Sequence, residues 1–434
     1  AEAQFLDILK ADPIWQKGVH TELASLYALK QDWAKSAESY SKAIEVWPKR
    51  ANLYLARGSV YTELKDYGSA EADFSKAVQI EPKTAPRAMF HRALISFRQD
   101  DYKEAHNRLD QAMALKPDAG LAKQINLLAI AVDKAEKKYK SWEITATFLI
   151  QYDDNVSLEP LDGWGVAAPG AGTSDKEDMS YGLSAKGSYF FIHKRAQEIG
   201  LSYTFRNQIY TNLSENDLFS HTLGGFFSHN TDPWYFRIEA DAGFYWANQE
   251  EKMTLYSVRP ALTRVFSSLD RTMFMGVLEY KRMLDDTEDV RRYILGALHY
   301  HTFKIKDPRG ITARAGLQWE YESSIEEGAT ASRLYELKTG ATFPLPLKLN
   351  LDVGLDYAWI YFDFDTTIDP DVEREDTRVI LSAKLGRSFG KDNQYRADVM
   401  WSHTYNDSNL TEAEQRDIYE FKRNVFSVIL TGTF

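Results

Sequence analysis

The stretch WYFRIEADAGFYWA, residues 234–247, decides the fold of the larger part of the chain. Every second residue is apolar or aromatic, and three of the residues between them are charged. A period of two is that of an extended strand, whose successive side chains point to opposite faces of a sheet. The apolar set is Phe236, Ile238, Ala240, Ala242, Phe244 and Trp246, and the polar set is Arg237, Glu239, Asp241 and Tyr245.

Two further stretches alternate in the same way, ITARAGLQWEYE at 311–322 and LNLDVGLDYAW at 349–359. Burying the charged set inside a soluble sandwich would be very costly, so that set must face water. A barrel wall with lipid outside and a wet lumen inside satisfies both sets. Tyrosine and tryptophan also gather here, since 18 of the 25 Tyr and seven of the ten Trp follow residue 140. They suit an aromatic belt at a membrane interface.

The alternation predicts fourteen strands, an even number, as in single-chain bacterial barrels. Short connections such as TDP and GKDN alternate with longer acidic ones, notably residues 159–178 and 363–376. Because short turns belong to the periplasmic side, whatever precedes the first strand is predicted to be periplasmic. The final FSVILTGTF resembles the terminal signal of barrel assembly. The predicted strands are 142–156, 179–192, 198–211, 219–230, 234–247, 253–267, 272–284, 290–303, 311–323, 332–343, 347–362, 377–389, 394–405 and 419–434.

Before residue 141 the pattern is helical, and it repeats. Prolines stand at Pro13, Pro48, Pro82 and Pro117, at intervals of 35, 34 and 35 residues. The last three follow matching segments, SAESYSKAIEVWP, SAEADFSKAVQIEP and EAHNRLDQAMALKP, and the turn before each segment reads QDW, KDY or DDY. Intervals of this length indicate helical repeats that stack on one another.

The repeats resemble the tetratricopeptide repeat (TPR), in which small residues stand where two helices cross and a proline ends the second helix. The small residues are Ala24, Gly58 and Ala93 in the first helices and Ala70, Ala105, Ala43, Ala77 and Ala112 in the second, where Ser36 is a departure. An aromatic residue follows three positions after the first small residue, as Tyr27 and Tyr61, and Ser96 departs from it. Residues 1–13 form half a unit, and 118–140 predict a closing helix. The predicted fold is therefore α plus membrane β, with a periplasmic TPR domain over 1–140 and a transmembrane antiparallel β-barrel over 141–434.

By the same resemblance, the first helix of each unit lines a concave face that docks a peptide or protein. We call this predicted set the docking face, and a plain solvated surface is the alternative. It comprises Thr21, Ser25, Ala28, Asn52, Leu55, Ser59, Thr62, Arg87, Phe90, Leu94 and Phe97.

Composition excludes several classes of function. The chain has no cysteine, which removes disulfides, thiolate metal sites and cysteine nucleophiles. Residues 1–141 carry a net charge of +3 and the rest −14, which argues against a nucleic-acid partner. No G-x-S-x-G, H-E-x-x-H or P-loop pattern is present, so we expect neither an enzyme nor a cofactor. No apolar run is long enough for a transmembrane helix, and we interpret the start at Ala1 as a mature form without its signal peptide.

Three small groups could bind ions, and for each we favour a plainer interpretation, so that no metal site is expected. His299 and His301 share one face of a strand and could hold a metal with a third ligand, but ordinary histidines are far commoner there. Asp153, Asp154 and Asn155 could hold a hard cation such as Ca²⁺ or could simply be a polar strand end. The acidic segment 363–376 is interpreted first as a solvated loop.

The charges predicted to face the lumen are mixed in sign. Most would brace the wall by pairing across strands, and a selective pore lining is the alternative. They are Arg206, Arg237, Arg314, Lys384 and Arg387 with Glu239, Asp241, Glu320, Asp352 and Asp356.

Helical repeats followed by a barrel resemble the surface lipoprotein assembly modulators, whose barrel has fourteen strands. The Asp154-Asn155-Val156 step and the ending from Arg423 to Phe434 are similar to that family. The resemblance implies an outer-membrane protein that contacts membrane lipid and helps a periplasmic protein or lipoprotein client reach the surface, without catalysis. An exopolysaccharide export porin is one alternative, although such porins carry longer repeat arrays and a lumen of one charge sign. A non-catalytic scaffold or porin partner of a larger complex is another.

Overall fold

The computed structural model describes residues 16–156, 177–247, 250–284, 289–325, 331–363, 373–409 and 421–434. The chain forms two compact units, Ala1–Lys140 and Ser141–Phe434, and each is described by itself. The half unit expected over residues 1–13 lies outside the described residues, as do most of the two long acidic connections.

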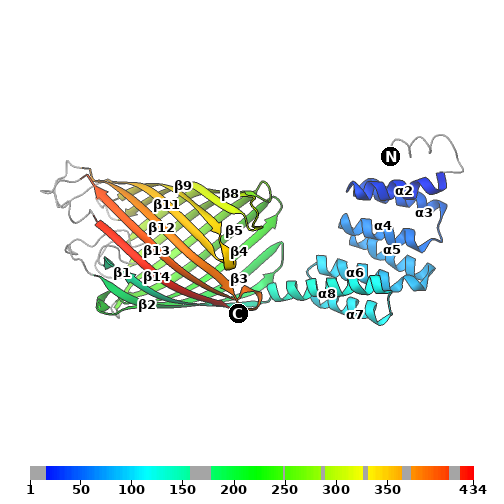
Figure 1. Cartoon of the computed structure of the whole chain (residues 1–434), viewed down its shortest axis with the longest axis horizontal. Coiled ribbons are helices and arrows are strands. Elements are labelled where there is room, and N and C mark those ends of the chain that lie inside the picture. The colour runs from blue at the N-terminus through cyan, green and yellow to red at the C-terminus, as the bar shows by residue number, and fades with distance from the viewer. Residues whose placement is uncertain are drawn as a thin grey trace. The chain divides into compact units, whose positions relative to one another are not determined.

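The first unit is a stack of helices (Figure 1). α2 packs with α3, α4 with α5 and α6 with α7, and α8 packs on α7. Among the described residues, no helix is both long and apolar enough to cross a membrane. The bounds are α2 (Gln16–Leu29), α3 (Trp33–Val46), α4 (Ala51–Glu63), α5 (Tyr67–Ile80), α6 (Ala85–Arg98), α7 (Tyr102–Ala114) and α8 (Ala119–Lys138).

An aspartate sets each turn between paired helices. Asp32, Asp66 and Asp101 accept a hydrogen bond from the backbone N–H three residues on, at 3.3, 3.1 and 3.0 Å. Each bond satisfies one of the N–H groups that a helix start leaves without a partner. The residue before each aspartate has a φ between 58° and 61°, which reverses the chain in a short turn. The QDW, KDY and DDY motifs are therefore helix caps.

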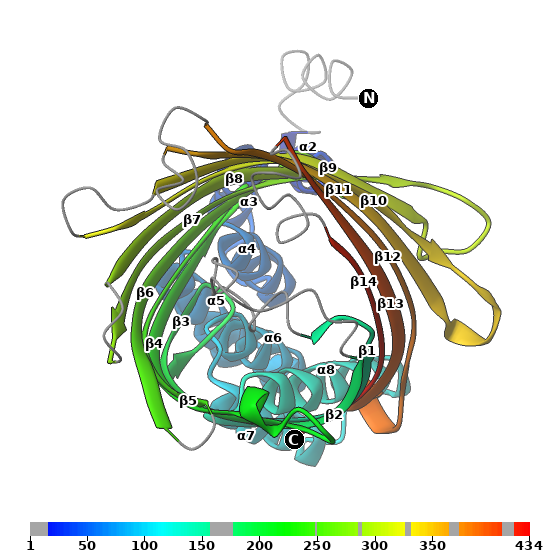
Figure 2. The same cartoon turned by 90° about the vertical axis from the view of Figure 1, so that its left-hand side faces the viewer.

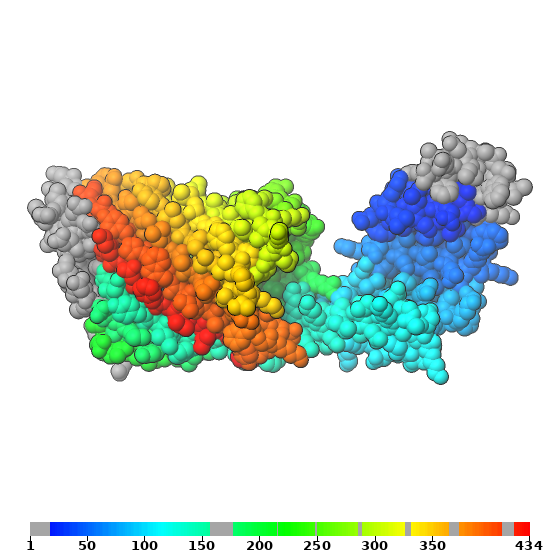
Figure 3. Space-filling model, viewed as in Figure 1, coloured from blue at the N-terminus to red at the C-terminus, as the bar shows by residue number. Residues whose placement is uncertain are grey.

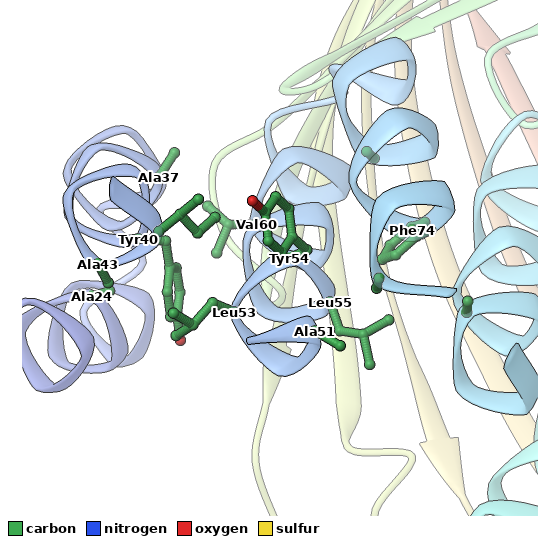
Figure 4. Close-up of a cluster of buried hydrophobic side chains, with 14 of the residues drawn as sticks. Ala24, Ala37, Tyr40, Ala43, Ala51, Leu53, Tyr54, Leu55, Val60 and Phe74 are labelled. Carbon is green, nitrogen blue, oxygen red and sulfur yellow. The ribbon is translucent and has the colours of Figure 1, made fainter. Parts of the chain in front are cut away.

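Small residues let the helices of the first unit approach closely, as the repeat pattern predicts. Ala24 and Ala43 are fully buried where α2 meets α3, and Figure 4 shows them near Tyr40. Gly58 shows the requirement most clearly, because a Cβ atom at this position would lie 2.6 Å from the ring of Phe74. Phe74 is itself fully buried, so its ring has little room to give way.

The second unit is a closed barrel of fourteen antiparallel strands (Figure 2). Each strand pairs with its neighbours in sequence, and β14 closes the ring on β1. The predicted strand number is confirmed, with small shifts at the ends. The bounds are β1 (Trp142–Asp153), β2 (Asp178–His193), β3 (Gln197–Tyr210), β4 (Leu218–Thr231), β5 (Trp234–Ala247), β6 (Glu250–Val265), β7 (Asp270–Met283), β8 (Val290–Phe303), β9 (Ile311–Ser324), β10 (Ala331–Pro344), β11 (Asn350–Phe362), β12 (Glu375–Phe389), β13 (Tyr395–Ser408) and β14 (Phe421–Thr433).

The start of β11 shows why some strand ends shift. The strand begins at Asn350 and not at 347, because Pro346–Lys348 form a tight turn. Leu347 and Lys348 have φ values of 61° and 60° there. Because Leu347 continues the apolar alternation in the sequence, the predicted strand included these turn residues.

The two faces of the barrel wall differ as the alternation predicts. One face carries large apolar side chains that are exposed, such as Leu317 at 68 %. The other carries ion pairs that reach over an intervening strand, such as Arg237 of β5 with Glu198 of β3 and Lys281 of β7 with Glu322 of β9. Side chains converge on the concave side of a curved sheet, so the charges face the lumen and the apolar residues face outward. Figure 3 shows the outward surface as continuous slanting rows of strands.

Candidate functional sites in the repeat unit and the barrel lumen

The predicted docking face falls on α2, α4 and α6, the first helices of the three described pairs. Most of its side chains are at least partly exposed, including Asn52 and Arg87. Leu55 and Thr62 are buried, with 5 % and 2 % of their surfaces exposed. The Thr62 hydroxyl donates to the Gly58 carbonyl at 2.9 Å. These two residues support the face from beneath and are not accessible to a partner as the unit stands.

A histidine that the sequence reasoning missed lies beside this face. His91 of α6 stacks on Phe74 of α5 at a ring distance of 5.2 Å, and its Nδ1 lies 3.5 Å from the Ser59 hydroxyl of α4. Burial, with a smaller contribution from the charge of Arg87, lowers the pKa of His91 to about 4. The ring is therefore neutral at ordinary pH, and this half-buried side chain links three helices through its contacts with Phe74 and Ser59. Nothing in the repeat pattern marks this position.

A mostly buried ion pair ties three helices together. Arg57 of α4 donates two hydrogen bonds to the Asp73 carboxylate of α5, both at 2.8 Å, and a third to the Ser41 hydroxyl of α3 at 2.9 Å. Asp73 is only 5 % exposed, so its charge depends on these donors. A similar ionic set links α5, α6 and α7 through Glu71, Arg92 and Arg108.

The predicted lumen charges lie on the inner face and are mostly paired with the opposite sign. Their partners include residues that the sequence reasoning missed, because these stand one or two strands away. The pairs are Arg237 with Glu239 and Glu198, Asp241 with Arg259, Arg314 with Asp352, Glu320 with Arg292, and Asp356 with Lys338. Arg206 and Lys384 lie on the same face by register.

The prediction for Arg387 is wrong. Its register partner on β13 is Ala397, and Arg387 stands on the outward face with the exposed Leu385 and Phe389. Residues 384 and 387 are three apart on one strand, so a period of two places them on opposite faces.

Arg314 shows how glycines shape the lumen wall. Its guanidinium crosses β10 and donates to both Asp352 oxygens on β11, at 2.7 and 3.0 Å. A Cβ atom at Gly340 would lie 2.6 Å from the guanidinium, and one at Gly354 would lie 3.2 Å from it. The two glycines therefore leave a flat path along which the arginine reaches its partner.

The two motifs that carried the family resemblance meet where the barrel closes. Asp153 of β1 is fully buried and accepts two or more hydrogen bonds from Arg423 of β14. Asp154 accepts from the backbone and side chain of Asn424, at 2.6 and 2.7 Å. Asn155 donates to the Lys422 carbonyl at 2.8 Å. Hydrogen-bond donors of β14 therefore satisfy the carboxylates of both Asp153 and Asp154. The cluster joins the ends of β1 and β14, which agrees with the polar strand end and not with the cation site.

The histidine pair His299 and His301 stands on the outward face near the short-turn end of β8. His301 Nδ1 lies 2.5 Å from Asp270 Oδ1, and His299 Nδ1 lies 2.9 Å from the Thr272 hydroxyl. Of the segment 363–376, the described Asp376 is buried and paired with Arg374. Within the described ranges, one set of three side chains has the mutual spacing of metal ligands, namely the largely solvated His106, Asp133 and Glu136.

Comparison with known proteins identifies the repeat. The family model of the tetratricopeptide repeat matches residues 51–84, which hold α4 and α5. No curated protein sequence matches.

Several solved structures similar to the chain are TPR domains or chaperones, and each corresponds to about a quarter of this chain. They include the TPR2B domain of yeast Sti1 in a pHsp70 complex (23 % identity, 27 % of this chain, 97 % of that chain, TM-score 0.25) and the Arabidopsis OM64 TPR domain (26 %, 26 %, 94 %, 0.24). The Yersinia enterocolitica type III secretion chaperone SycD, in complex with a peptide of the translocator YopD, is also similar (16 %, 27 %, 92 %, 0.24). At these TM-scores the likenesses carry no argument about partners. The chain therefore combines a helical TPR region with a closed barrel of fourteen antiparallel strands.

Proposed function

We propose that this chain lies in the outer membrane of a Gram-negative bacterium and moves a protein or lipoprotein client to the cell surface. The observation that carries the proposal is the union of the two units in one chain. α8 ends at Lys138 and β1 begins at Trp142, so a protein-interaction module is tied to a barrel by a few residues. A barrel that serves as a plain channel has no need of such a module, whereas stacked repeats offer an extended binding surface.

The chemistry of the docking face supports a polypeptide client. Phe90 and Leu94 are partly exposed and pack on the core beneath them, while Asn52 and Arg87 are exposed. Apolar patches bordered by hydrogen-bonding groups suit a peptide that has both apolar side chains and a polar backbone.

The lumen supports the same proposal over polysaccharide export. Its charges lie in pairs of opposite sign, such as Arg314 with Asp352 and Lys281 with Glu322. Such pairs stiffen the wall and leave no dominant sign to attract an anionic sugar chain.

The experiment compares cells that carry the native chain with cells that carry the double substitution Arg87→Glu and Phe90→Ala. Surface proteins are released by brief protease treatment of intact cells and quantified by mass spectrometry. We expect one or a few proteins to fall to background, because the client no longer docks. Lys103→Glu, on the exposed side of α7, is the matched control and should leave the surface proteins unchanged.

Barrel assembly is checked in each strain by the faster migration of the unheated protein in detergent gels. Removing residues 1–140 should leave an assembled barrel and abolish display of the same proteins. An unchanged set of surface proteins around an assembled barrel contradicts the proposal. Loss of surface polysaccharide in place of protein would instead support a function in polysaccharide export. Loss of neither would support a scaffold role.

A further inference from the structure

The outward face of the barrel has a hollow at the ends of β10 and β11 that lie away from the short turn between these two strands. It is lined by Arg333 and Tyr335 of β10 and by Trp359 and Tyr361 of β11, and its volume is about 530 Å³. A hollow of this size is within the range of sites for small ligands, roughly 300–1,000 Å³. It opens on the face that carries exposed apolar residues and not on the lumen.

Strand register extends the hollow into an ordered aromatic surface. Tyr321 of β9, Arg333 and Tyr361 stand side by side in one row, and Tyr293 of β8 continues it. The next row toward the short turns holds Trp319, Tyr335 and Trp359. Neighbouring rings lie within contact distance, with centroids 6.1 Å apart for Tyr335 and Tyr361 and 6.4 Å for Trp319 and Tyr321. Beyond these rows the outward residues of β9 and β10 become aliphatic, as at Leu317 and Leu337.

Two arginines border this surface. The Arg333 side chain is 48 % exposed and gives one terminal nitrogen to Asp363. Among the described residues its other N–H donors have no acceptor, and they can meet a second anion. Arg291 of β8 is exposed and has no acidic partner among the described residues. Arg291 pairs in register with Ser323, two residues further along β9 than the partner of Arg333, so their Cα atoms are about 12 Å apart by strand spacing. Arginines on a lipid-facing wall are costly unless an anion meets them.

We propose that this surface binds the phosphorylated sugar headgroup of a glycolipid in the outer leaflet. Arg333 and Arg291 each hold a phosphate, since a guanidinium matches phosphate oxygens with paired N–H donors. The sugar rings between the phosphates lie on Tyr293 and Tyr321, and part of the lipid fills the hollow beside Trp359. The acyl chains follow the aliphatic rows toward the short-turn end. The inference rests on membrane insertion with the longer connections at the outer leaflet, and it is independent of client export.

The test uses the purified full chain in nanodiscs made of phosphatidylcholine alone. A glucosamine disaccharide lipid that carries two phosphates is titrated while tryptophan fluorescence is recorded, and bound lipids are counted by native mass spectrometry. We expect saturable binding of one lipid. Replacing both arginines, Arg333→Gln with Arg291→Gln, should weaken binding about tenfold or more, because charge-assisted hydrogen bonds to phosphate are lost. Trp359→Leu should remove most of the fluorescence change.

Arg387→Gln is the matched control, since Arg387 also faces outward but lies at the short-turn end. Its affinity should equal that of the native chain, and all variants should keep the heat-modifiable migration of a closed barrel. Equal binding of the dephosphorylated lipid or of phosphatidylglycerol overturns the proposal, as does competition by inorganic phosphate at the same concentration. Equal affinity in the arginine double variant also overturns it. None of these outcomes depends on whether a client is exported.

Discussion

The repeat unit and the barrel use the same side chains in opposite ways. In the repeat unit the large apolar residues are buried, and Phe74 is fully enclosed between helices. In the barrel Leu317 is 68 % exposed, whereas the side chains of Lys281 and Glu322 are 6 % and 10 % exposed and paired. The exposed fraction of a side chain therefore does not by itself indicate how much that side chain stabilises its unit. The medium around each unit sets the free energy that exposing an apolar side chain costs.

Backbone hydrogen bonding explains why both arrangements are stable. Each barrel strand is bonded on both sides, because β14 closes on β1, so the ring leaves no free edge. The helices of the repeat unit satisfy their backbones internally and depend on packing to stay together. A charge in the repeat core must therefore be paired, a charge in the lumen is tolerated, and a charge near the middle of the outward wall is costly, whereas one near a strand end, such as Arg387, costs less.

The largest effect is expected in the repeat core. Asp73→Ala should destabilise the repeat unit by about 3–5 kcal/mol, because it leaves Arg57 without its main partner. Urea unfolding of the helical circular-dichroism signal in the full chain measures the change. Asp110→Ala, at an exposed position of α7, is the control and should stay within about 0.5 kcal/mol. A loss below 1 kcal/mol for Asp73→Ala would mean that water reaches the pair.

The next effect separates the two units directly. Leu317→Arg should cost about 2–4 kcal/mol, because position 317 stands near the middle of β9 on the outward face. Leu29→Arg is its matched partner in the repeat unit, where Leu29 is 84 % exposed to water, and should change stability by about 0.5 kcal/mol or less. Reversible unfolding from lipid vesicles in guanidinium measures both. Equal small costs would show that the barrel wall does not face lipid.

Periodicity was sufficient to predict the fold because it depends on neighbours in sequence. Residues 234–247 carry the two faces of the barrel wall in their alternation, and the proline interval carries the repeat. The ion-pair partners within the lumen depend on the register between strands. A shift in one strand pair changes which residues of later strands lie opposite one another. Arg314 and Asp352 stand two strands apart, and β2 and β3 shift register between Phe190 and Ile192.

The repeat pattern also did not predict which of its variable positions are buried. Leu55 and Thr62 occupy docking-face positions by resemblance, yet both are buried in the folded unit. His91 takes part in the core only because Phe74 and Ser59 come together in the folded stack. A repeat motif records which positions are small or aromatic, and it does not record what the variable positions meet.

A third effect tests close packing against helix propensity. Gly58→Ala should destabilise the repeat unit by about 1–3 kcal/mol, because the added methyl group meets the Phe74 ring. Gly18→Ala is the control, since a Cβ atom there has open space around it, and it should stabilise the unit by up to about 1 kcal/mol. Thermal unfolding of the helical signal reports both signs. Stabilisation by both substitutions would show that the Phe74 ring moves aside freely.

The smallest expected effect is on the pH dependence of the stability of the repeat unit. It distinguishes His91 from a histidine at the surface. Above pH 6.5, His91 is neutral in both the folded and the unfolded chain. Below it the unfolded chain binds a proton that the folded chain accepts only near pH 4, because the pKa of His91 is lowered to about 4. Stability that is present at pH 7 is therefore lost as the pH falls, by about 1–2 kcal/mol at pH 5.

His91→Phe should remove this part of the pH dependence while keeping the stacking on Phe74, and urea midpoints at pH 7 and pH 5 measure the difference. His106→Gln is the control, because His106 lies at the surface beside Asp133, and its profile should follow that of the native chain. An unchanged pH dependence in His91→Phe would show that His91 does not carry the acid sensitivity of the repeat unit.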